Sequence, residues 1–465
     1  MDLTNRQQSR WNAVGLYIAL LATSIAASSA QTLAVRTVAR GLDTPWEILW
    51  GPDGWLWVTE RYGRISRVHP ETGQILELAR LGDVYEQGES GLLGMALHPN
   101  FVDSPFVFVA YTYREGSQIF ERIVRFRYDG TTLSQMQVLL DRIRGASIHN
   151  GCRLLILPDR TLLITTGDAN NTATSQNLQS LNGKVLRVRL DGSIPDDNPF
   201  PNSPLWAVGL RNSQGLTWHD GIVYASEHGP NSDDEINIIE AGRNYGWPEV
   251  LGWCDTPTEQ AFCTEHRVVE PIAAWTPTIA PCGLAYYAGT RFPMWQHSLL
   301  LVTLKAARLV VLKLDSTRRK VVQERHYLAG ELGRLRAICV SPDGRIFLGT
   351  SNRDGRGTPA ADDDRIVELS IASATEQDYR SLALWFEPEP LSSSAYLRVS
   401  LPYAAPIRLT LSDMLGRTCA AWDLGHQPDG IATFELTFPA LAGGSYVATL
   451  SVGDIHVRRT VLLSP

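Results

Sequence analysis

The sequence predicts an all-β protein, a six-bladed β-propeller followed by a small C-terminal β-sandwich. A hairpin pattern, made of an apolar strand, a Pro/Asp/Gly turn and a second apolar strand, recurs six times before residue 371. Repetition of one short unit is typical of repeat architectures, and a propeller protects its strand edges by radial repetition. The 13 Trp and 38 Gly residues also fit many short strands joined by tight turns. A β-sandwich series would give regular strands but would not need the same hairpin six times.

The N-terminus predicts a signal peptide over residues 1–30. Arg6 and Arg10 precede an apolar run at 14–25, and small residues follow at 26–30. This order is typical of a secretory signal, and an apolar run of about a dozen residues is short of the roughly 20 that span a bilayer. An uncleaved membrane anchor is the alternative. We therefore expect an exported protein, periplasmic, cell-surface or extracellular, with no stable membrane insertion.

The six hairpins place the propeller domain at residues 31–370. Their alternating apolar side chains suit strands that are buried between neighbouring sheets. The loops at the strand ends of a propeller converge on one mouth of its central channel, so functional residues are expected just before or after the hairpins. The copies lie at 48–60, 95–112, 154–168, 216–229, 338–352 and, in degenerate form, 292–305.

The chain changes character after the propeller. Residues 371–390 are rich in Pro and Ser and predict a linker. Residues 391–465 contain alternating strand patterns such as YLRVSLPY, IRLTLSDMLGR and GSYVATLSVG, which predict a β-sandwich. No cluster of catalytic residue types lies among these strands, so we expect the chemistry in the propeller.

The charge of the protein argues against nucleic acid as a partner. The formal net charge is -7, and the 42 Lys and Arg residues do not gather in a basic stripe. Binding of nucleic acid calls for such a stripe or for clustered cations on one face. We therefore expect a small-molecule ligand rather than nucleic acid.

The six cysteines are expected to serve structure. No CxxC motif and no Cys/His pattern with zinc spacing occurs. Cys254 and Cys263 flank a short polar loop, and we expect a disulfide to close it, because export leads to an oxidising compartment. The other four are expected to be buried small apolar side chains, and they are Cys152, Cys282, Cys339 and Cys419.

Polar residues beside the hairpins are the candidate site. His149 precedes the third hairpin, where a neutral imidazole can accept the proton of a substrate hydroxyl; the alternative for a lone loop histidine is a solvated surface residue. Four cations at comparable positions predict a site for a polyanionic ligand, because guanidinium groups clamp carboxylates, although each cation alone would be interpreted as surface. The four are Arg211, Lys305, Arg334 and Arg336.

The stretch at residues 206–248 predicts a calcium site. It combines a Gly-Pro turn, the acids Asp233, Asp234 and Glu235, and a Tyr-Gly-Trp-Pro corner. Calcium takes six to eight oxygen ligands and tolerates loose geometry, which suits carboxylates and turn carbonyls placed side by side. The acid run at 362–364 has no such neighbours and is interpreted as a loop.

The propeller resembles a known family through several ordered motifs between about residues 40 and 370. These are GLDTPWEILWGPDGWLWVTER, GESGLLGMALHPNF, IHNGCRLLILPD with TTGDA, LNGKVLRVRLDGSIPDDNPF, GLRNSQGL, SEHGPNSDDEINIIEAGRNYGWP, TPTIAPCGLAYY and GRLRAICVSPDG. The chain is similar to the soluble pyrroloquinoline-quinone (PQQ)-dependent aldose sugar dehydrogenases, which include the soluble quinoprotein glucose dehydrogenase. A match over this many ordered blocks is far more specific than any single motif.

The resemblance implies roles for individual residues. His149 matches the general base that takes the proton from the C1 hydroxyl of an aldose while hydride passes to PQQ, and Arg211 and Asn212 match the pair over the quinone, near the reacting centre. Glu89 matches a Gln or Glu near the cofactor. Lys305, Arg334 and Arg336 match the cations that hold the cofactor carboxylates and quinone oxygens.

The resemblance also implies two calcium sites and shows three departures. Gly229 and Pro230 match the turn whose carbonyls bind the calcium that touches the cofactor, and Glu235 and Tyr245 match ligands of a second, structural calcium. Where some members have an acid before the base this chain has Ile148, so its base needs another orienting partner. Two cysteines stand where the family has small residues, at positions 152 and 282.

The C-terminal segment resembles a second family. The pieces SDMLGR and GGSYVATLSVGDIHVRRTVLL, within about residues 380–465, look like the C-terminal sorting domains of type IX secretion. This resemblance implies that the secretion machinery is a partner.

Three functional classes remain open from the sequence. A quinoprotein sugar dehydrogenase, which uses an aldose and an unidentified electron acceptor, accounts for the most motifs. A calcium-dependent propeller lactonase would need carboxylate and amide side chains around a central metal, whereas the cation site expected here is built from turn carbonyls beside arginines. A non-catalytic carbohydrate-binding propeller would not need His149 together with the four cations.

Overall fold

The computed structural model describes residues 33–371, 383–387, 390–401, 404–428, 430–452 and 455–464. The chain forms two compact units, one of which is Leu33–Ile371, and the other contains the described residues from 383 onward. The expected signal peptide at 1–30 and most of the expected linker lie outside the described residues. No helix in the described part of the chain is long and apolar enough to cross a membrane.

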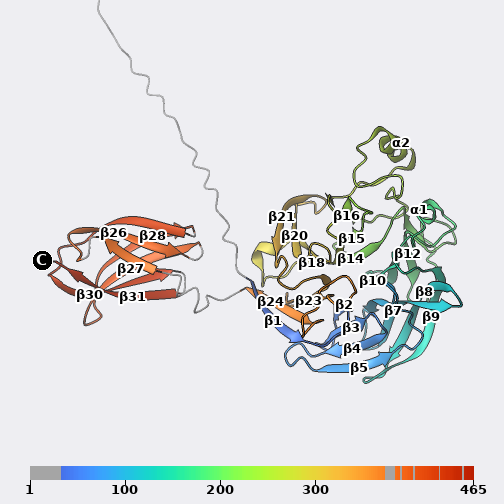
Figure 1. The fold of residues 1–465 in the computed structure, drawn as a ribbon, viewed down its shortest axis with the longest axis horizontal. Coiled ribbons are helices and arrows are strands. Elements are labelled where there is room, and N and C mark those ends of the chain that lie inside the picture. Colours follow the sequence, from blue (N-terminus) through green and yellow to red (C-terminus); the bar gives the residue numbers. More distant parts are fainter. Residues whose placement is uncertain are drawn as a thin grey trace, which may run out of the picture. The chain divides into compact units, whose positions relative to one another are not determined.

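The first unit is a six-bladed β-propeller, as predicted (Figure 1). The first strand of each blade contacts the first strands of both neighbouring blades, so six inner strands close a ring around the channel. Three blades are formed by β2 (Pro45–Trp50), β3 (Leu56–Glu60), β4 (Arg64–Val68) and β5 (Ile75–Arg80); by β6 (Leu92–Leu97), β7 (Phe106–Glu115), β8 (Gln118–Tyr128) and β9 (Leu133–Arg144); and by β10 (Gly151–Ile156), β11 (Thr161–Thr166), β12 (Lys184–Arg189) and β13 (Leu205–Val208).

The last blade joins the two ends of this unit. Its outer strand β1 pairs antiparallel with β24, and the two lie side by side in Figure 1, so pairing between distant segments closes the ring. The remaining blades are β14 (Ser213–His219), β15 (Ile222–Glu227), β16 (Asp234–Ile238) and β17 (Ala273–Trp275); β18 (Pro281–Tyr287), β19 (Ser298–Thr303), β20 (Leu309–Leu314) and β21 (Val321–Tyr327); and β22 (Leu335–Val340), β23 (Ile346–Thr350), β24 (Ile366–Ile371) and β1 (Leu33–Ala39).

The hydrophobic core of the propeller lies between blades rather than within them. One cluster joins Trp57 of the first blade to Met95 and Val109 of the second, and all three side chains are fully buried. A strand that is buried on both faces has a continuous apolar sequence, and β19 (SLLLVT), which is buried along its whole length, is an example. Burial of an apolar side chain contributes about 1.5–3 kcal/mol, so neighbouring blades stabilise one another.

The degenerate fifth hairpin was placed wrongly by the sequence. Its first strand is β18, which ends at Tyr287, and the stretch before β19 forms a 3₁₀ turn, η1 (Pro293–Trp295). Trp295 stacks on Phe292 at a centroid distance of 4.6 Å, and both are buried. The Phe-Pro-Met-Trp sequence is therefore a buried aromatic turn between the strands of this hairpin.

Two short helices interrupt the propeller. Helix α1 (Ala173–Gln176) follows β11, and α2 (Pro257–His266) lies between β16 and β17. The predicted disulfide joins Cys254 to Cys263. The expectation of a polar loop between these cysteines is wrong, because most of this segment forms α2. Thr256, the N-cap of the helix, and Glu259 form a capping box.

The second unit is the predicted β-sandwich. A buried cluster contains Leu397 of one sheet together with Leu409 and Leu450 of the other. The sheets have the strand orders β25-β26-β29 and β28-β27-β30-β31. Their strands are β25 (Ala383–Glu387), β26 (Ser394–Leu401), β27 (Ala405–Asp413), β28 (Thr418–Gln427), β29 (Gly430–Thr437), β30 (Gly444–Val452) and β31 (Ile455–Leu463).

Three of the four remaining cysteines are buried as predicted, namely Cys152, Cys282 and Cys339. The prediction is wrong for Cys419, which is half-buried on β28 because alternate side chains of this strand face solvent.

Candidate active site

A recurring bulge directs side chains into one mouth of the channel. In each of the six innermost hairpins the pairing register shifts within the first four residues of the inner strand, as between Ser213 and Gly215 or between Leu335 and Ala337. A bulge adds one residue and re-aims its side chain, and bulges are common beside active sites. Here the residues within the bulges include Gln214, Cys282 and Arg336. Gln214 accepts from Arg336 at 3.3 Å and contacts the Cys282 Sγ at 3.8 Å.

His149 is held in a strained but well-supported turn at this mouth. Its φ of 59° is left-handed, a conformation that few non-glycine residues adopt. Its carbonyl accepts from Ala169 N at 3.0 Å, and this approach requires Gly167, since a Cβ there would lie 1.8 Å from the His149 carbonyl oxygen. His149 is thereby fixed against the loop after β11.

The orienting partner of His149 is Asp168. The His149 Nδ1 lies 2.8 Å from Asp168 Oδ1, and Asp168 is fully buried. The Asp168 Oδ1 also accepts from Asn170 N at 2.8 Å, and its Oδ2 accepts from the indole Nε1 of Trp247 at 3.0 Å. A carboxylate on Nδ1 favours the tautomer whose Nε2 carries the lone pair, so His149 can accept a proton at Nε2.

Glu89 links His149 to Asn212. Its Oε2 accepts from His149 N at 3.2 Å and lies 3.5 Å from Asn212 Nδ2, while its Oε1 pairs with Arg356 at 2.9 Å. Burial alone would raise the pKa of Glu89, but His228, the His149 N–H and the Arg356 charge together bring it below its usual value. Glu89 is therefore an ionised group at the wall of the site.

Arg211 and Asn212 are positioned by Glu227. The Glu227 Oε1 accepts from the backbone N–H groups of both, at 3.0 Å for Arg211, and Ser213 donates to its other oxygen. Burial raises the pKa of Glu227 to about 7. The Arg211 guanidinium donates to the carbonyl of His228 at 3.1 Å, so it is turned toward the Gly-Pro turn.

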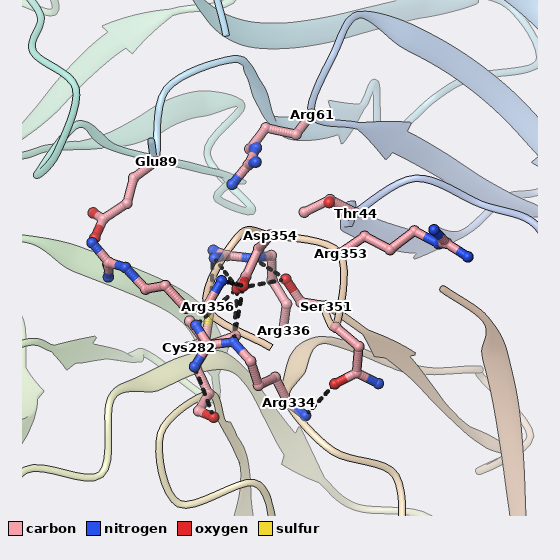
Figure 2. Close-up of polar contacts among 12 residues, drawn as sticks. Thr44, Arg61, Glu89, Cys282, Arg334, Arg336, Ser351, Arg353, Asp354 and Arg356 are labelled. Atoms are coloured by element: carbon pink, nitrogen blue, oxygen red, sulfur yellow. Dashed lines mark hydrogen bonds and ion pairs between the residues drawn. The ribbon is translucent and has the colours of Figure 1, made fainter. Parts of the chain in front are cut away.

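A cationic cavity of about 600 Å³ opens beside these residues (Figure 2). Its lining contains six cationic and three carboxylate side chains, a surplus of three positive charges. Of the predicted cofactor residues, Glu89, Lys305, Arg334 and Arg336 line it, whereas Arg211 and Asn212 do not. The six cations are Arg61, Lys305, Arg334, Arg336, Arg353 and Arg356, and the carboxylates are Glu86, Glu89 and Asp354.

Asp354 orders the arginines at the base of this cavity. It accepts from Arg334 Nε at 2.9 Å, lies 3.8 Å from Arg336 Nη2, and accepts from Ser351 at 3.1 Å, as Figure 2 shows. The carboxylate is buried, yet its pKa is lowered, because the two guanidinium groups outweigh the desolvation. Two predicted cofactor cations are thus held in fixed orientations.

The side chains of Lys305 and Arg61 differ in solvent exposure. Lys305 is exposed and donates from Nζ to Thr278 at 2.6 Å. Arg61, which sequence reasoning did not single out, is 7% exposed and pairs with Glu86 at 2.7 Å. Its Nε has no hydrogen-bond partner among the described residues. A buried N–H without a partner costs free energy, and the Arg61 side chain that carries it lines the cationic cavity.

The Gly229–Pro230 turn is anchored by Asp234. The Asp234 Oδ1 accepts from Gly229 N at 2.8 Å, and its Oδ2 accepts from Ile279 N and Ala280 N at 2.5 and 2.7 Å. In the described part of the chain, no hydrogen bond uses the carbonyl of Gly229 or Pro230. These carbonyls are therefore free to bind a cation.

Glu235 and Tyr245 line a second cavity, of about 20 Å³, together with Glu227 and with the Gly229–Pro230 turn itself. Burial, with the Glu227 charge nearby, raises the pKa of Glu235 to about 8. The Tyr245 hydroxyl donates to the Ile238 carbonyl at 2.6 Å, so only its backbone oxygen remains for a cation. No group of three or more His, Cys, Asp or Glu side chains able to hold a metal is found among the described residues.

The opposite mouth of the channel has none of the predicted site residues. A cavity of about 420 Å³ there has a largely apolar lining and contains the buried pair Glu47–Arg153, whose nearest atoms are 2.5 Å apart. The Arg153 Nε donates to the carbonyl of Gln214, a lining residue of the cationic cavity, at 2.8 Å. The Arg153–Gln214 contact thus lies between the two cavities.

Sequence reasoning did not single out several residues of the site, although three of them lie in motifs quoted above. Asp168 lies in the quoted TTGDA motif and Trp247 in the Gly-Trp-Pro corner. Arg61 ends the quoted motif GLDTPWEILWGPDGWLWVTER, whereas Asp354 carried no pattern beyond ordinary loop charges. The run at 362–364 is a loop, as interpreted, but Asp363 and Asp364 are buried, and Asp364 accepts from the backbone of Asn352 at 2.6 Å.

Comparison with known proteins decides the family. Residues 42–359 match the model described as Glucose / Sorbosone dehydrogenase. The chain belongs to this family of PQQ-dependent sugar dehydrogenases. Its members are oxidoreductases, so the predicted enzyme class is confirmed.

The matched relatives of this dehydrogenase cover most of the propeller. It is 29% identical to quinoprotein glucose dehydrogenase B of Acinetobacter calcoaceticus, over 71% of this chain and 87% of that protein. It is also 29% identical to an aldose sugar dehydrogenase of Escherichia coli, over 70% of this chain and 91% of that protein. The PQQ-bound aldose sugar dehydrogenase of Streptomyces coelicolor shares 36% identity and a TM-score of 0.65 with it, over 74% of this chain and all of that one.

Proposed function

We propose that the protein is an exported quinoprotein that oxidises the C1 hydroxyl of aldose sugars to lactones, with PQQ as the hydride acceptor and calcium beside it. The observation that carries this proposal is the cationic cavity next to the His149–Asp168 pair. PQQ, when bound, supplies the two-electron acceptor for the hydride that leaves C1.

The cavity fits a tricarboxylate cofactor by charge. A surplus of three positive charges lines it, and the Nε of Arg61 is buried without a partner. Arginine forks bind carboxylates with two parallel hydrogen bonds, which gives orientation as well as affinity. Arg334 and Arg336, ordered by Asp354, and Lys305 would hold the carboxylates and quinone oxygens, with Glu89 at the opposite wall.

His149 is proposed as the general base. Its Nδ1 is engaged by Asp168, so Nε2 takes the proton of the C1 hydroxyl as the C1–H bond breaks. Asp168 then stabilises the imidazolium that forms. Arg211 is proposed to stabilise the negative charge that develops at the acceptor side, so charge is compensated at both ends of the transfer.

Two calcium ions are proposed, in different roles. The carbonyls of Gly229 and Pro230 would hold the ion that polarises the cofactor, because both are free of hydrogen bonds in the described residues. Glu235 and the backbone carbonyl of Tyr245 would hold a structural ion in the small buried cavity, whose lining also contains the carboxylate residues Glu227 and Asp233. Calcium accepts such mixed oxygen ligands.

The deciding experiment is dye reduction by purified protein without cofactor, on a panel of aldoses, with and without PQQ and calcium. We expect turnover only when both are added. His149→Ala should lower kcat by about two to four orders of magnitude and leave PQQ binding nearly intact. Absence of cofactor-dependent turnover on every sugar would contradict the proposal, and lactone hydrolysis without PQQ would support the lactonase alternative.

Export by way of the C-terminal β-sandwich is proposed on the resemblance of that unit to type IX sorting domains. The mature protein should begin near Gln31, and removal of residues 391–465 should keep it from the cell surface and the medium. Mass spectrometry of the secreted chain tests both expectations. An intact N-terminus in the exported protein would contradict the signal peptide.

A further inference from the structure

Trp247 lies where the general base and Arg211 meet, although sequence reasoning placed its Gly-Trp-Pro corner only at a calcium site. Its indole Nε1 donates to Asp168 Oδ2 at 3.0 Å, and the other oxygen of that carboxylate contacts His149 Nδ1 at 2.8 Å. One side chain thus contacts the group that orients the base.

The face of the same indole contacts a second site residue. The Arg211 guanidinium carbon lies 5.4 Å from the centre of the Trp247 ring, within the range of a cation–π interaction. Asp168 follows β11 in one blade, whereas Arg211 and Trp247 belong to the segments around β14 and β16 of the next. The indole therefore couples side chains from two blades.

The backbone of Trp247 is fixed independently of these contacts. Its N–H donates to the carbonyl of Gly209 at 3.0 Å, and its own carbonyl accepts from Gln176 Nε2 at 2.8 Å. Gln176 also contacts the Asn244 side chain at 3.1 Å. With both backbone groups anchored, the indole is presented to Asp168 from a rigid support.

The hydrogen bond from the Trp247 indole changes the negative charge that Asp168 presents to His149, an effect that packing alone would not have. Asp168 accepts three donors, from His149, Asn170 and Trp247. Each hydrogen bond to a carboxylate stabilises its charged form and draws negative charge away from the remaining partners. Without the indole N–H, more charge would face His149, and the imidazolium would be favoured.

We propose that Trp247 is a positioning residue of the dehydrogenation, whose N–H holds Asp168 in the orientation that His149 requires and whose ring supports Arg211. This inference rests on the proposed function. The charged groups that face the His149–Asp168 pair are Glu89 and Arg211, and Arg356 and His228 act on Glu89. None of these is changed in the variants below.

The test compares Trp247→Phe, which keeps a ring under Arg211 but loses the N–H, with Trp206→Phe. Trp206 is a matched control, because it also has an arginine over its ring, Arg187 at 4.7 Å, and no recorded contact with Asp168. We expect Trp247→Phe to lower kcat roughly tenfold and to move the acidic limb of the kcat profile up by about one pH unit. KM and PQQ affinity should stay within about twofold.

A measurement on the protein without cofactor separates this inference from the proposed function. Nitrogen-15 NMR of the imidazoles, with His149 assigned by the loss of its signal in His149→Gln, should show a higher pKa for His149 in Trp247→Phe. If Trp247→Phe does not fold, Trp247→Tyr serves, since it also lacks a donor at the Nε1 position.

Three outcomes overturn the proposal. An unchanged pH profile and His149 pKa, with only a lower Tm, would make Trp247 a packing residue. Loss of PQQ affinity with an unchanged His149 pKa would assign it to the cofactor site. The same loss of kcat in Trp206→Phe would remove the specificity of the effect. Absence of sugar-dependent turnover in the wild type, by contrast, would overturn the proposed function and leave the NMR result to stand alone.

Discussion

At the residue scale, the site depends on carboxylates that are buried for different purposes. Asp354 is kept ionised by two guanidinium groups, whereas Asp234 accepts three backbone N–H donors, so each orients a neighbouring structure. Glu227 and Glu235 have raised pKa values, since burial outweighs their donors. Low-pKa carboxylates are fixed hydrogen-bond acceptors, whereas high-pKa ones bind either a proton or a cation.

Arg336 is predicted to contribute directly to cofactor affinity. Arg336→Met should weaken PQQ binding by about 10- to 100-fold, because a buried charge-assisted hydrogen bond is worth roughly 1.5–3 kcal/mol. Fluorescence titration of the protein with PQQ measures this, and Arg291→Met, an exposed residue paired with Asp343, is the control. Equal affinities of the two variants would place the carboxylates of PQQ elsewhere.

Calcium stabilisation is predicted to increase with pH between 6 and 8.5. Glu235 has a folded pKa of about 8 against an ordinary 4.5, so the folded state holds its proton more tightly than the unfolded one. Without calcium, its contribution to stability is present at low pH and falls as pH rises toward 8, because the unfolded state releases the proton first. Calcium needs the ionised form.

Thermal melting with and without calcium, at several pH values, checks this expectation. The rise in Tm on adding calcium should be larger at pH 8.5 than at pH 6. Glu235→Gln should reduce the pH dependence, and the remaining part is expected from Glu227 in the same cavity, whose pKa of about 7 lies within this range. A calcium effect that is the same at both pH values would argue against Glu235 as a ligand.

At the element scale, the bulge of the inner hairpins is the feature that builds the site. A regular strand would alternate its side chains between the two faces of a blade. The extra residue at the mouth instead brings Gln214, Cys282 and Arg336 together from three blades. One local irregularity, repeated around the ring, thus lines the channel mouth with side chains from neighbouring blades.

The disulfide at α2 is predicted to stabilise only its own segment. Replacing Cys254 and Cys263 by Ser should cost about 2–3 kcal/mol locally, through the entropy of the short loop that it closes. Hydrogen exchange should show faster exchange in residues 251–268, while PQQ-dependent activity stays within about twofold. Loss of activity in this variant would show that α2 supports the site.

At the scale of the whole molecule, the two units have separate cores. The buried residues of the sandwich form a single cluster from its own two sheets, and the propeller closes its ring through β1 and β24 without residues beyond Ile371. A chain truncated after residue 371 should therefore keep its Tm and its kcat within about twofold. Differential scanning calorimetry and dye reduction measure both, and unfolding of the truncated chain would contradict the independence of the units.

Much of the architecture could be predicted because propeller blades are local structures. Each hairpin carries its own apolar strands and turn residues, such as Asp53, which accepts from Trp55 N at 3.2 Å in the first turn. The prediction failed for the fifth hairpin because a buried aromatic turn separates its two strands, and the apolar sequence of this turn is similar to that of a strand.

The sequence alone determined the fold class, the order of the site motifs, the disulfide and the membership of a dehydrogenase family. Only the tertiary structure decided that Asp168 and Trp247 orient His149, that Asp354 orders Arg334 and Arg336, and that Arg61 faces the same cavity. The physical reason is that these contacts join segments from different blades. Local sequence specifies each blade, but which side chains meet at the mouth depends on closure of the ring and on the bulges that aim them.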